Sequence, residues 1–165
     1  MANKSESLKR ELISALLETR AAILHEASGL SPDAQNTVFL GVWSVVDLIA
    51  HLVGWNFTNL VAAKDIQAGK LPEFYAHYDK DWKTYNAQLV AKYKCDDFGE
   101  LLALVKDSHH QLIEYLGTVP AEAFEKDFGV RSGRNYKVTI ARLLQAEWKD
   151  EQKHLQQIRD FKAKQ

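Results

Sequence analysis

Apolar residues in this chain recur at three- and four-residue steps, and this spacing predicts four long helices. The expected helices cover residues 5–27, 44–69, 97–117 and 136–162. No segment alternates apolar and polar residues for long, and the chain has no Asn-Gly or Asp-Gly hairpin signal. We therefore predict an all-α protein, an antiparallel four-helix bundle that forms a single domain over residues 1–165.

Local signals refine these boundaries. Ser44 with Asp47 resembles a capping box ahead of the second long helix. The connection between the second and third long helices is unusually long for a bundle. Part of it, from about residue 79 to residue 94, is expected to form an extra helix, and a short helical turn is expected over residues 120–125.

The last predicted helix carries ionisable residues where its face should be apolar. The residues that project onto that face, or lie at its edge, are Glu147, Asp150, Glu151 and His154. Burying an unpaired carboxylate costs several kcal/mol or forces the group to take up a proton. These groups therefore need partners, which could be another side chain, a trapped water, a substrate or a metal.

His51 is a second polar residue at an apolar position, on a helix rich in Val, Ile and Leu. Because the helices of a bundle share one core, His51 could meet His154 there, with Asp150, Glu147 or Glu151 nearby. Two imidazoles and one carboxylate suit zinc, nickel or ferrous iron, with open positions for water or substrate. The pattern thus indicates a metal site built from two facing helices.

A purely structural polar core is the alternative interpretation. A single histidine on an apolar face is more often a satisfied core residue than a ligand. The two glutamates could equally form ion pairs with basic residues, the candidates being Arg131, Arg134, Arg142 and Lys149.

Composition narrows the classes of function. The 165 residues are 46% hydrophobic and 26% charged, with a formal net charge of −1, as in an ordinary globular protein. Without a basic excess, no nucleic-acid partner is expected. Cys95 is the only cysteine, which excludes an internal disulfide and a cysteine-based zinc knuckle. We see no signal peptide and no stretch long and apolar enough to span a bilayer, so we expect a cytoplasmic location and no membrane partner. The expected partner is a small-molecule substrate. A homodimer is a further possible arrangement.

Weaker motifs accompany the main one. An aromatic stripe in the long connection suggests packing, or else a ring-lined pocket, and its members are Tyr75, Tyr78, Trp82 and Tyr85. Arg131 and Arg134 flank Gly133, which fits either an anion clamp or a solvated loop. His109 and His110 are adjacent, so their rings point in different directions and we expect them at the surface.

Residues 43–55 resemble the second-helix signature of the DinB/YfiT-like superfamily, which has a tryptophan, a cap, an acid and a leucine-rich turn bearing a histidine. Gly54-Trp55, followed by a polar insertion that ends near Asn86, is similar to the ClbS/DfsB group of four-helix-bundle proteins. Residues 154–158 resemble the end of the fourth-helix motif of the superfamily. The resemblance covers most of the chain in element order.

The resemblance implies a divalent metal, zinc or nickel, held by one histidine of the second helix and two of the fourth. These positions fall on His51, Asp150 and His154, so the middle one carries an aspartate here. The implied site is either a metal centre with these three ligands or a metal-free polar pocket, as in ClbS-like relatives. Glu147 and Glu151 would act as the catalytic carboxylates or orient a ligand.

The resemblance also implies an activity on reactive electrophiles. Members of the superfamily are thiol S-transferases or isomerases that use a low-molecular-weight thiol, and ClbS-like members hydrolyse an electrophilic cyclopropane in a genotoxin. Three functions follow. The first is a metal-dependent transferase or hydrolase, the second a metal-free hydrolase or protective binding protein, and the third a non-enzymatic helical stress-response protein.

Overall fold

The computed structural model describes residues 3–165, with the side chains of all of them except residues 77–80. The helices are α1 (Lys4–Ser28), α2 (Pro32–Asn36), α3 (Val45–Gln67), α4 (Phe74–Tyr93), α5 (Phe98–Thr118), the 3-10 turn η1 (Ala121–Ala123) and α6 (Ile140–Lys162). Only isolated β-bridges, and no strand, occur in the described part of the chain. The predicted all-α fold is confirmed.

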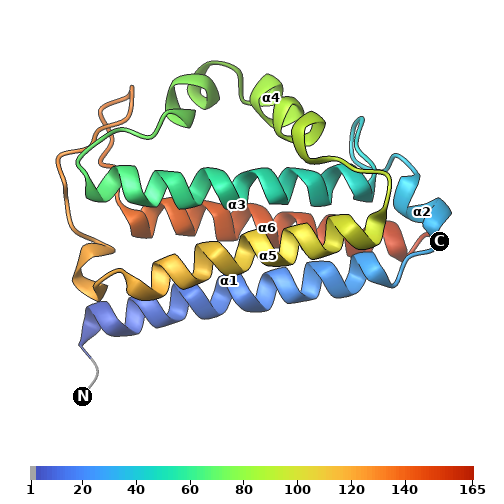
Figure 1. Cartoon of the computed structure of the whole chain (residues 1–165), viewed down its shortest axis with the longest axis horizontal. Helices are drawn as coiled ribbons and strands as arrows, with labels where there is room; N and C mark the ends of the chain where they lie inside the picture. Colours follow the sequence, from blue (N-terminus) through green and yellow to red (C-terminus); the bar gives the residue numbers. More distant parts are fainter. Residues whose placement is uncertain (1–2) are drawn as a thin grey trace.

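The four long helices α1, α3, α5 and α6 form a bundle of two parallel pairs that run in opposite directions (Figure 1). α1 packs along α6, and α3 packs along α5. Because α3 and α5 point the same way, the chain must travel back along the bundle between them. α4 makes this return over the outer side of α3 (Figure 1), which explains why the connection is so long.

Side-chain caps begin the helices where local signals predict them. The Ser44 hydroxyl accepts a hydrogen bond from the N–H of Asp47 at 3.3 Å, and the Asp47 carboxylate accepts one from the N–H of Ser44 at 2.8 Å. The capping box is therefore confirmed. In the same way, the Asp97 carboxylate accepts a hydrogen bond from the N–H of Glu100 at 3.0 Å and begins α5.

The last helix begins later than predicted. α6 starts at Ile140, where we expected residue 136, because the preceding residues are extended. The N–H of Val138 donates to the carbonyl of Val130 at 3.1 Å, and the Thr139 hydroxyl then caps the helix. This pairing joins segments that the helical pattern treats separately, so the pattern could not reveal it.

α4 begins at Phe74, before the predicted start at residue 79, and it is not one continuous helix. Asp81 has non-helical backbone angles, φ −152° and ψ 73°. Its carboxylate accepts a hydrogen bond from the N–H of Thr84 at 3.1 Å and caps the second half. The sequence pattern indicates mainly this second half.

A polar layer divides the apolar core of the bundle into two clusters. On α1, Arg20 separates the buried residues Leu16 and Ile23, which belong to different clusters. Near the middle of the other long helices, the buried polar residues are Asn56, Asn59, Ser108, His109 and Glu151. All four long helices therefore contribute polar side chains to the interior.

α3 corrects one expectation about hydropathy. By length and composition this helix could cross a membrane, although we expected no such stretch. Its most apolar window is 78% buried inside the protein. Its position at the centre of the bundle, against α4, α5 and α6, accounts for that hydropathy.

Candidate metal centre and polar core

His51 of α3 and His154 of α6 meet inside the bundle, beside Asp150. The Nε2 atom of His154 lies 3.1 Å from Oδ2 of Asp150, and Nε2 of His51 lies 3.9 Å from the same oxygen. The two imidazole rings are edge to face, with centroids 5.4 Å apart. One potential ligand atom from each of the three residues lies within 4.8 Å of the other two. The geometry thus brings together the three residues that the family resemblance implies as ligands.

The hydrogen bonding of His154 provides a test of whether these residues fit a metal. Its Nδ1 atom lies 2.8 Å from the Oε1 atom of Gln157, which can only accept, so Nδ1 carries the hydrogen. In the neutral ring, Nε2 then directs a lone pair at the Asp150 carboxylate. A proton or a metal ion between the two atoms removes this repulsion. Two imidazoles and one carboxylate are also a ligand set that zinc accepts, so the residues fit a divalent ion.

Charge is distributed unevenly over this cluster. Burial lowers the pKa of His51 below its ordinary value. Burial also acts to lower the pKa of His154, but the Asp150 carboxylate outweighs it, and the pKa is raised. The Asp150 side chain is 52% exposed, and its partial burial acts to raise its pKa, but its interactions with His154 and His51 hold that pKa well below the usual range. Asp150 is therefore charged, and His154 is the imidazole more ready to hold a proton.

Aromatic rings enclose His51. The ring of Trp43 lies 4.8 Å from it and that of Trp55 lies 6.3 Å from it, between centroids. The indole N–H of Trp55 donates to Oδ1 of Asn86 at 2.9 Å. This bond attaches α4 to α3 next to the cluster and gives a physical reason for the Trp55 and Asn86 features of the sequence.

Glu151 forms a buried ion pair with Arg20 of α1. The Nε atom of Arg20 donates to Oε2 of Glu151 at 3.1 Å, and Nη2 donates to Oε1. The predicted partners on the C-terminal part of the chain are therefore wrong for Glu151, and Arg131 pairs with Asp127 instead. Arg20 occupies an apolar position of α1, four residues after Leu16, and this placement was the signal that could have revealed it.

Glu147 lies near this ion pair and has a different charge state. Burial raises its pKa to about 8, and the negative charge of Glu151 adds to the effect. Arg20 and the nearby Asn59 side chain act in the opposite direction and only reduce the rise. Although Glu147 is only half-buried by exposure, it is therefore the carboxyl group of this region most ready to hold a proton. Neighbouring carboxyl groups whose pKa values move apart, as in Glu147 and Asp150, are typical of acid–base sites.

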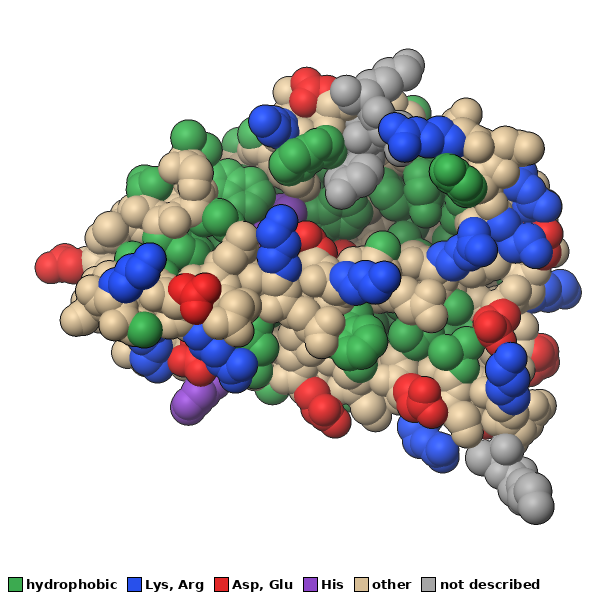
Figure 2. All heavy atoms as spheres, turned by 180° about the vertical axis from the view of Figure 1, so that it is seen from behind, with side chains coloured by type: hydrophobic (Ala, Val, Ile, Leu, Met, Phe, Trp, Pro, Cys, Tyr) green, Lys and Arg blue, Asp and Glu red, His purple; other side chains and the backbone are tan. Residues whose placement is uncertain are grey.

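Other polar groups of the interior have no hydrogen-bond partner among the described residues. These buried atoms are Arg20 Nη1, His51 Nδ1, Asn56 Oδ1, both polar atoms of the Asn59 side chain, and His109 Nε2. An unsatisfied buried polar group costs about 1–3 kcal/mol. The layer is therefore suited to water or to the polar part of a ligand. Figure 2 shows a hollow in one face of the molecule in which histidine and acidic side chains are visible beneath hydrophobic ones.

His109 corrects a further expectation. We expected both adjacent histidines at the surface, but His109 is buried, and only His110 is exposed, where it pairs with Glu114 at 3.1 Å. Burial, with a smaller contribution from the positive charge of Arg20, lowers the pKa of His109 to about 3. His109 is therefore a neutral member of the polar layer.

Comparison with known proteins assigns the chain to a family. The model of the DinB superfamily matches residues 15–158, so the chain belongs to this superfamily. No curated protein sequence matches. Its fold is similar to that of the colibactin self-resistance protein ClbS, crystallised in complex with double-stranded DNA, with a TM-score of 0.70 and 20% identity over 92% of this chain and 94% of that one. It is also similar to an uncharacterised protein from Escherichia coli UTI89, with a TM-score of 0.72 and 15% identity over 93% of this chain and 91% of that one.

These comparisons confirm the resemblance to the superfamily and are consistent with the ClbS/DfsB group. They contradict the expectation that no nucleic acid would be a partner, because ClbS was crystallised with double-stranded DNA. A net charge near zero was a poor basis for that expectation, since a local group of basic side chains is enough to contact phosphates.

Proposed function

We propose that the chain is a metal-dependent enzyme of the transferase or hydrolase class that acts on a small electrophilic molecule. His51, Asp150 and His154 would hold a divalent ion such as zinc or nickel. The observation that carries the proposal is the convergence of their ligand atoms within 4.8 Å, with Nδ1 of His154 engaged by Gln157. A hydrogen bond at the ring nitrogen that does not bind the metal orients an imidazole for ligation.

The bound ion would lower the pKa of a thiol or a water and so supply a nucleophile at neutral pH. The residues of the chain provide the rest. Glu147, protonated up to about pH 8, can donate its proton to the atom that leaves the electrophile. Glu151, held by Arg20, contributes the negative charge that helps to keep Glu147 protonated. In this proposal Glu147 is the catalytic carboxylate, and Glu151 positions and tunes it.

Metal content is the direct test. The protein is purified without chelator, loaded with zinc or nickel, desalted and analysed by mass spectrometry for bound metal. We expect about one equivalent in the parent and at least a tenfold loss in His51→Ala, Asp150→Asn and His154→Ala. His110→Ala removes an exposed histidine and should bind like the parent. Equal trace occupancy in all five proteins would refute metal dependence.

A metal-free hydrolase or protective binding protein is the second candidate. One observation in its favour is that Asp150 stands where the resemblance implies a histidine. Another is that the pKa of Asp150 is lowered while that of Glu147 is raised, as expected of an acid and a base in one site. It predicts that the metal-depleted protein still consumes a cyclopropane electrophile, and that Glu147→Gln abolishes this. A Glu147→Gln protein as active as the metal-depleted parent would exclude this candidate.

Duplex DNA is a partner to be tested with either candidate, because ClbS was crystallised with it. Fluorescence anisotropy of a labelled duplex, measured at two salt concentrations, would detect binding through phosphates, since such binding weakens steeply with salt. A cytoplasmic location remains part of the proposal.

A further inference from the structure

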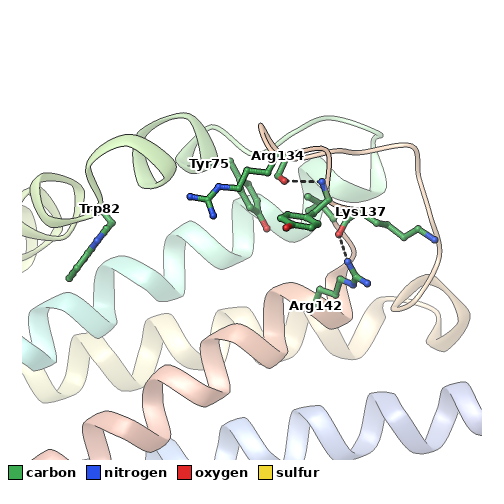
Figure 3. Close-up of a pocket in the computed structure, with 8 residues that line it drawn as sticks. Tyr75, Trp82, Arg134, Lys137 and Arg142 are labelled. Atoms are coloured by element: carbon green, nitrogen blue, oxygen red, sulfur yellow. Dashed lines mark hydrogen bonds between the residues drawn. The ribbon is translucent and has the colours of Figure 1, made fainter.

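A second concave site lies between α4 and the loop that leads into α6 (Figure 3). Its volume is about 470 Å³, within the range of small-molecule sites. The lining residues that matter here are three rings and three cations, namely Tyr75, Trp82, Tyr136, Arg134, Lys137 and Arg142. We call this site the basic cleft.

Among the side chains that the structure describes, the charged ones that line the basic cleft are all cationic. Within the described residues, neither Arg134 nor Arg142 has a carboxylate partner. Lys137 lies 3.4 Å from Asp127, which is already neutralised by hydrogen bonds of 2.8 and 2.9 Å from Arg131. The cleft therefore has an excess of positive charge, and guanidinium groups favour phosphate or carboxylate as the partner.

Aromatic rings give the cleft flat apolar faces. Trp82 is 50% exposed and Tyr136 is 64% exposed, which is unusual for rings of this size. Tyr75 stacks on Phe74 with centroids 4.3 Å apart. In Figure 3 the guanidinium of Arg134 lies between Tyr75 and Trp82, so a cation and ring faces point into the same space.

The aromatic stripe predicted from the sequence thus has two uses. Tyr75 and Tyr85 pack against the core, as expected of a packing stripe, whereas the cleft is lined by Trp82 and by the other side of Tyr75. Tyr78 lies outside the described side chains. The arginine-rich loop is also divided, since Arg131 is held by Asp127 and Arg134 faces the cleft.

A series of packed aromatic rings lies between the cleft and the proposed metal centre. Phe74 contacts Trp55 at 5.4 Å, and Trp55 contacts His51 at 6.3 Å, between ring centroids. On α6, Arg142 and Asp150 are eight residues apart, which corresponds to about 12 Å along the helix axis. The two sites therefore lie close together along α6, with the buried rings of Phe74 and Trp55 between them.

We propose that the basic cleft binds the anionic, ring-bearing end of a small molecule, an aryl phosphate or aryl carboxylate, and thereby selects the substrate of the neighbouring site. The substrate role rests on the proposed function, whereas binding in the cleft does not. A cleft of this size suits a small molecule better than duplex DNA, whose phosphates require an extended basic surface.

Three probes separate the contributions of charge and ring. Binding of 1-naphthyl phosphate, inorganic phosphate and 1-naphthol is measured by titration calorimetry at fixed salt. We expect 1-naphthyl phosphate to bind at least tenfold more tightly than either of the others. Arg134→Gln and Trp82→Ala should each weaken its binding at least fivefold. Arg10→Gln removes an exposed arginine of α1 and should have no effect.

Arg134→Gln is the cleaner substitution, because Arg142 donates a hydrogen bond to the carbonyl of Lys137 at 3.1 Å and so helps to shape the loop. Thermal unfolding of each variant checks that the fold is retained. His51→Ala should bind 1-naphthyl phosphate like the parent, so failure of the metal centre leaves this result unchanged. Equal affinities for the three probes, or an Arg134→Gln protein that binds like the parent, would overturn the proposal. Displacement of the aryl phosphate by a duplex present at lower concentration would also overturn it, in favour of a nucleic-acid site.

Discussion

The ion pair between Arg20 and Glu151 offers a quantitative test of the polar core. Arg20 is 2% exposed and Glu151 is 1% exposed, so water cannot replace either partner. Arg20→Met would leave the Glu151 carboxylate buried beside Glu147. Removing one partner of a buried pair destabilises a protein by about 3–5 kcal/mol, and we expect Arg20→Met to fall in this range.

Glu151→Met should cost less than Arg20→Met. Glu147 lies close enough for its pKa to be affected by the charges of both members of the pair. When Glu151 is removed, Glu147 loses a repulsive neighbour and can ionise beside Arg20, which restores part of the interaction. The double variant Arg20→Met/Glu151→Met removes both charges. Its free energy of unfolding should lie within about 1 kcal/mol of that of the parent, or exceed it. The two substitutions are therefore expected to be strongly non-additive.

Urea unfolding followed by circular dichroism measures all four free energies of unfolding. For a chain of this size, each kcal/mol corresponds to about 2–4 °C in Tm, so Arg20→Met should lower Tm by about 6 °C or more. Arg159→Met is a matched control, because its pair with Glu26 links the same two helices but Arg159 is 49% exposed on its side chain. Such a pair contributes about 1 kcal/mol or less. Additive losses in the double variant, or an Arg20→Met protein no less stable than the control, would refute the reasoning.

Three further predictions concern the same region. The folded protein keeps a proton on Glu147 up to about pH 8, whereas the unfolded chain loses it near 4.5, so this group makes stability fall as pH rises between these values. Glu147→Gln should flatten this fall in urea titrations at pH 5 and pH 8, and an unchanged difference would count against a raised pKa. A Cβ on Gly54 would lie 2.7 Å from Cβ of Leu89, so Gly54→Ala should lower the free energy of unfolding by about 1–3 kcal/mol. A Cβ on Gly117 would meet nothing within 4 Å, so the control Gly117→Ala should be neutral or stabilising. Equal effects of the two substitutions on Tm would contradict close contact of α4 with α3. Asp150→His should retain about one equivalent of zinc, and its loss would show that the carboxylate itself is required.

The regular elements of this fold were largely predictable from local features. The caps at Ser44 and Asp97 act within three residues, and the helical repeat extends over each long element. The start of α6 was mistaken because Val138 bonds to Val130, on the preceding extended segment. The break in α4 at Asp81 was likewise not evident from the repeat.

Some residues of the candidate site were likewise predictable from the sequence, and others were not. His51 and His154 could be proposed because polar groups at apolar helical positions are conspicuous in a sequence, and the family resemblance then pointed to Asp150 as the third ligand. Arg20 and His109 were harder to place, since a long basic side chain or one of two adjacent histidines is usually exposed. Their burial depends on which residues of other helices face them.

By itself, the sequence determined that the chain is helical, which apolar stripe of each long helix faces inward, and that the stripes of the second and last long helices carry ionisable groups. It could do so because helical periodicity and capping are properties of a few neighbouring residues. Only the tertiary structure decided that Arg20 pairs with Glu151, that His51 and His154 share Asp150, and that Arg134 and Trp82 line one cleft. These contacts depend on the direction and rotation of each helix against its neighbours, and packing of the whole bundle sets both.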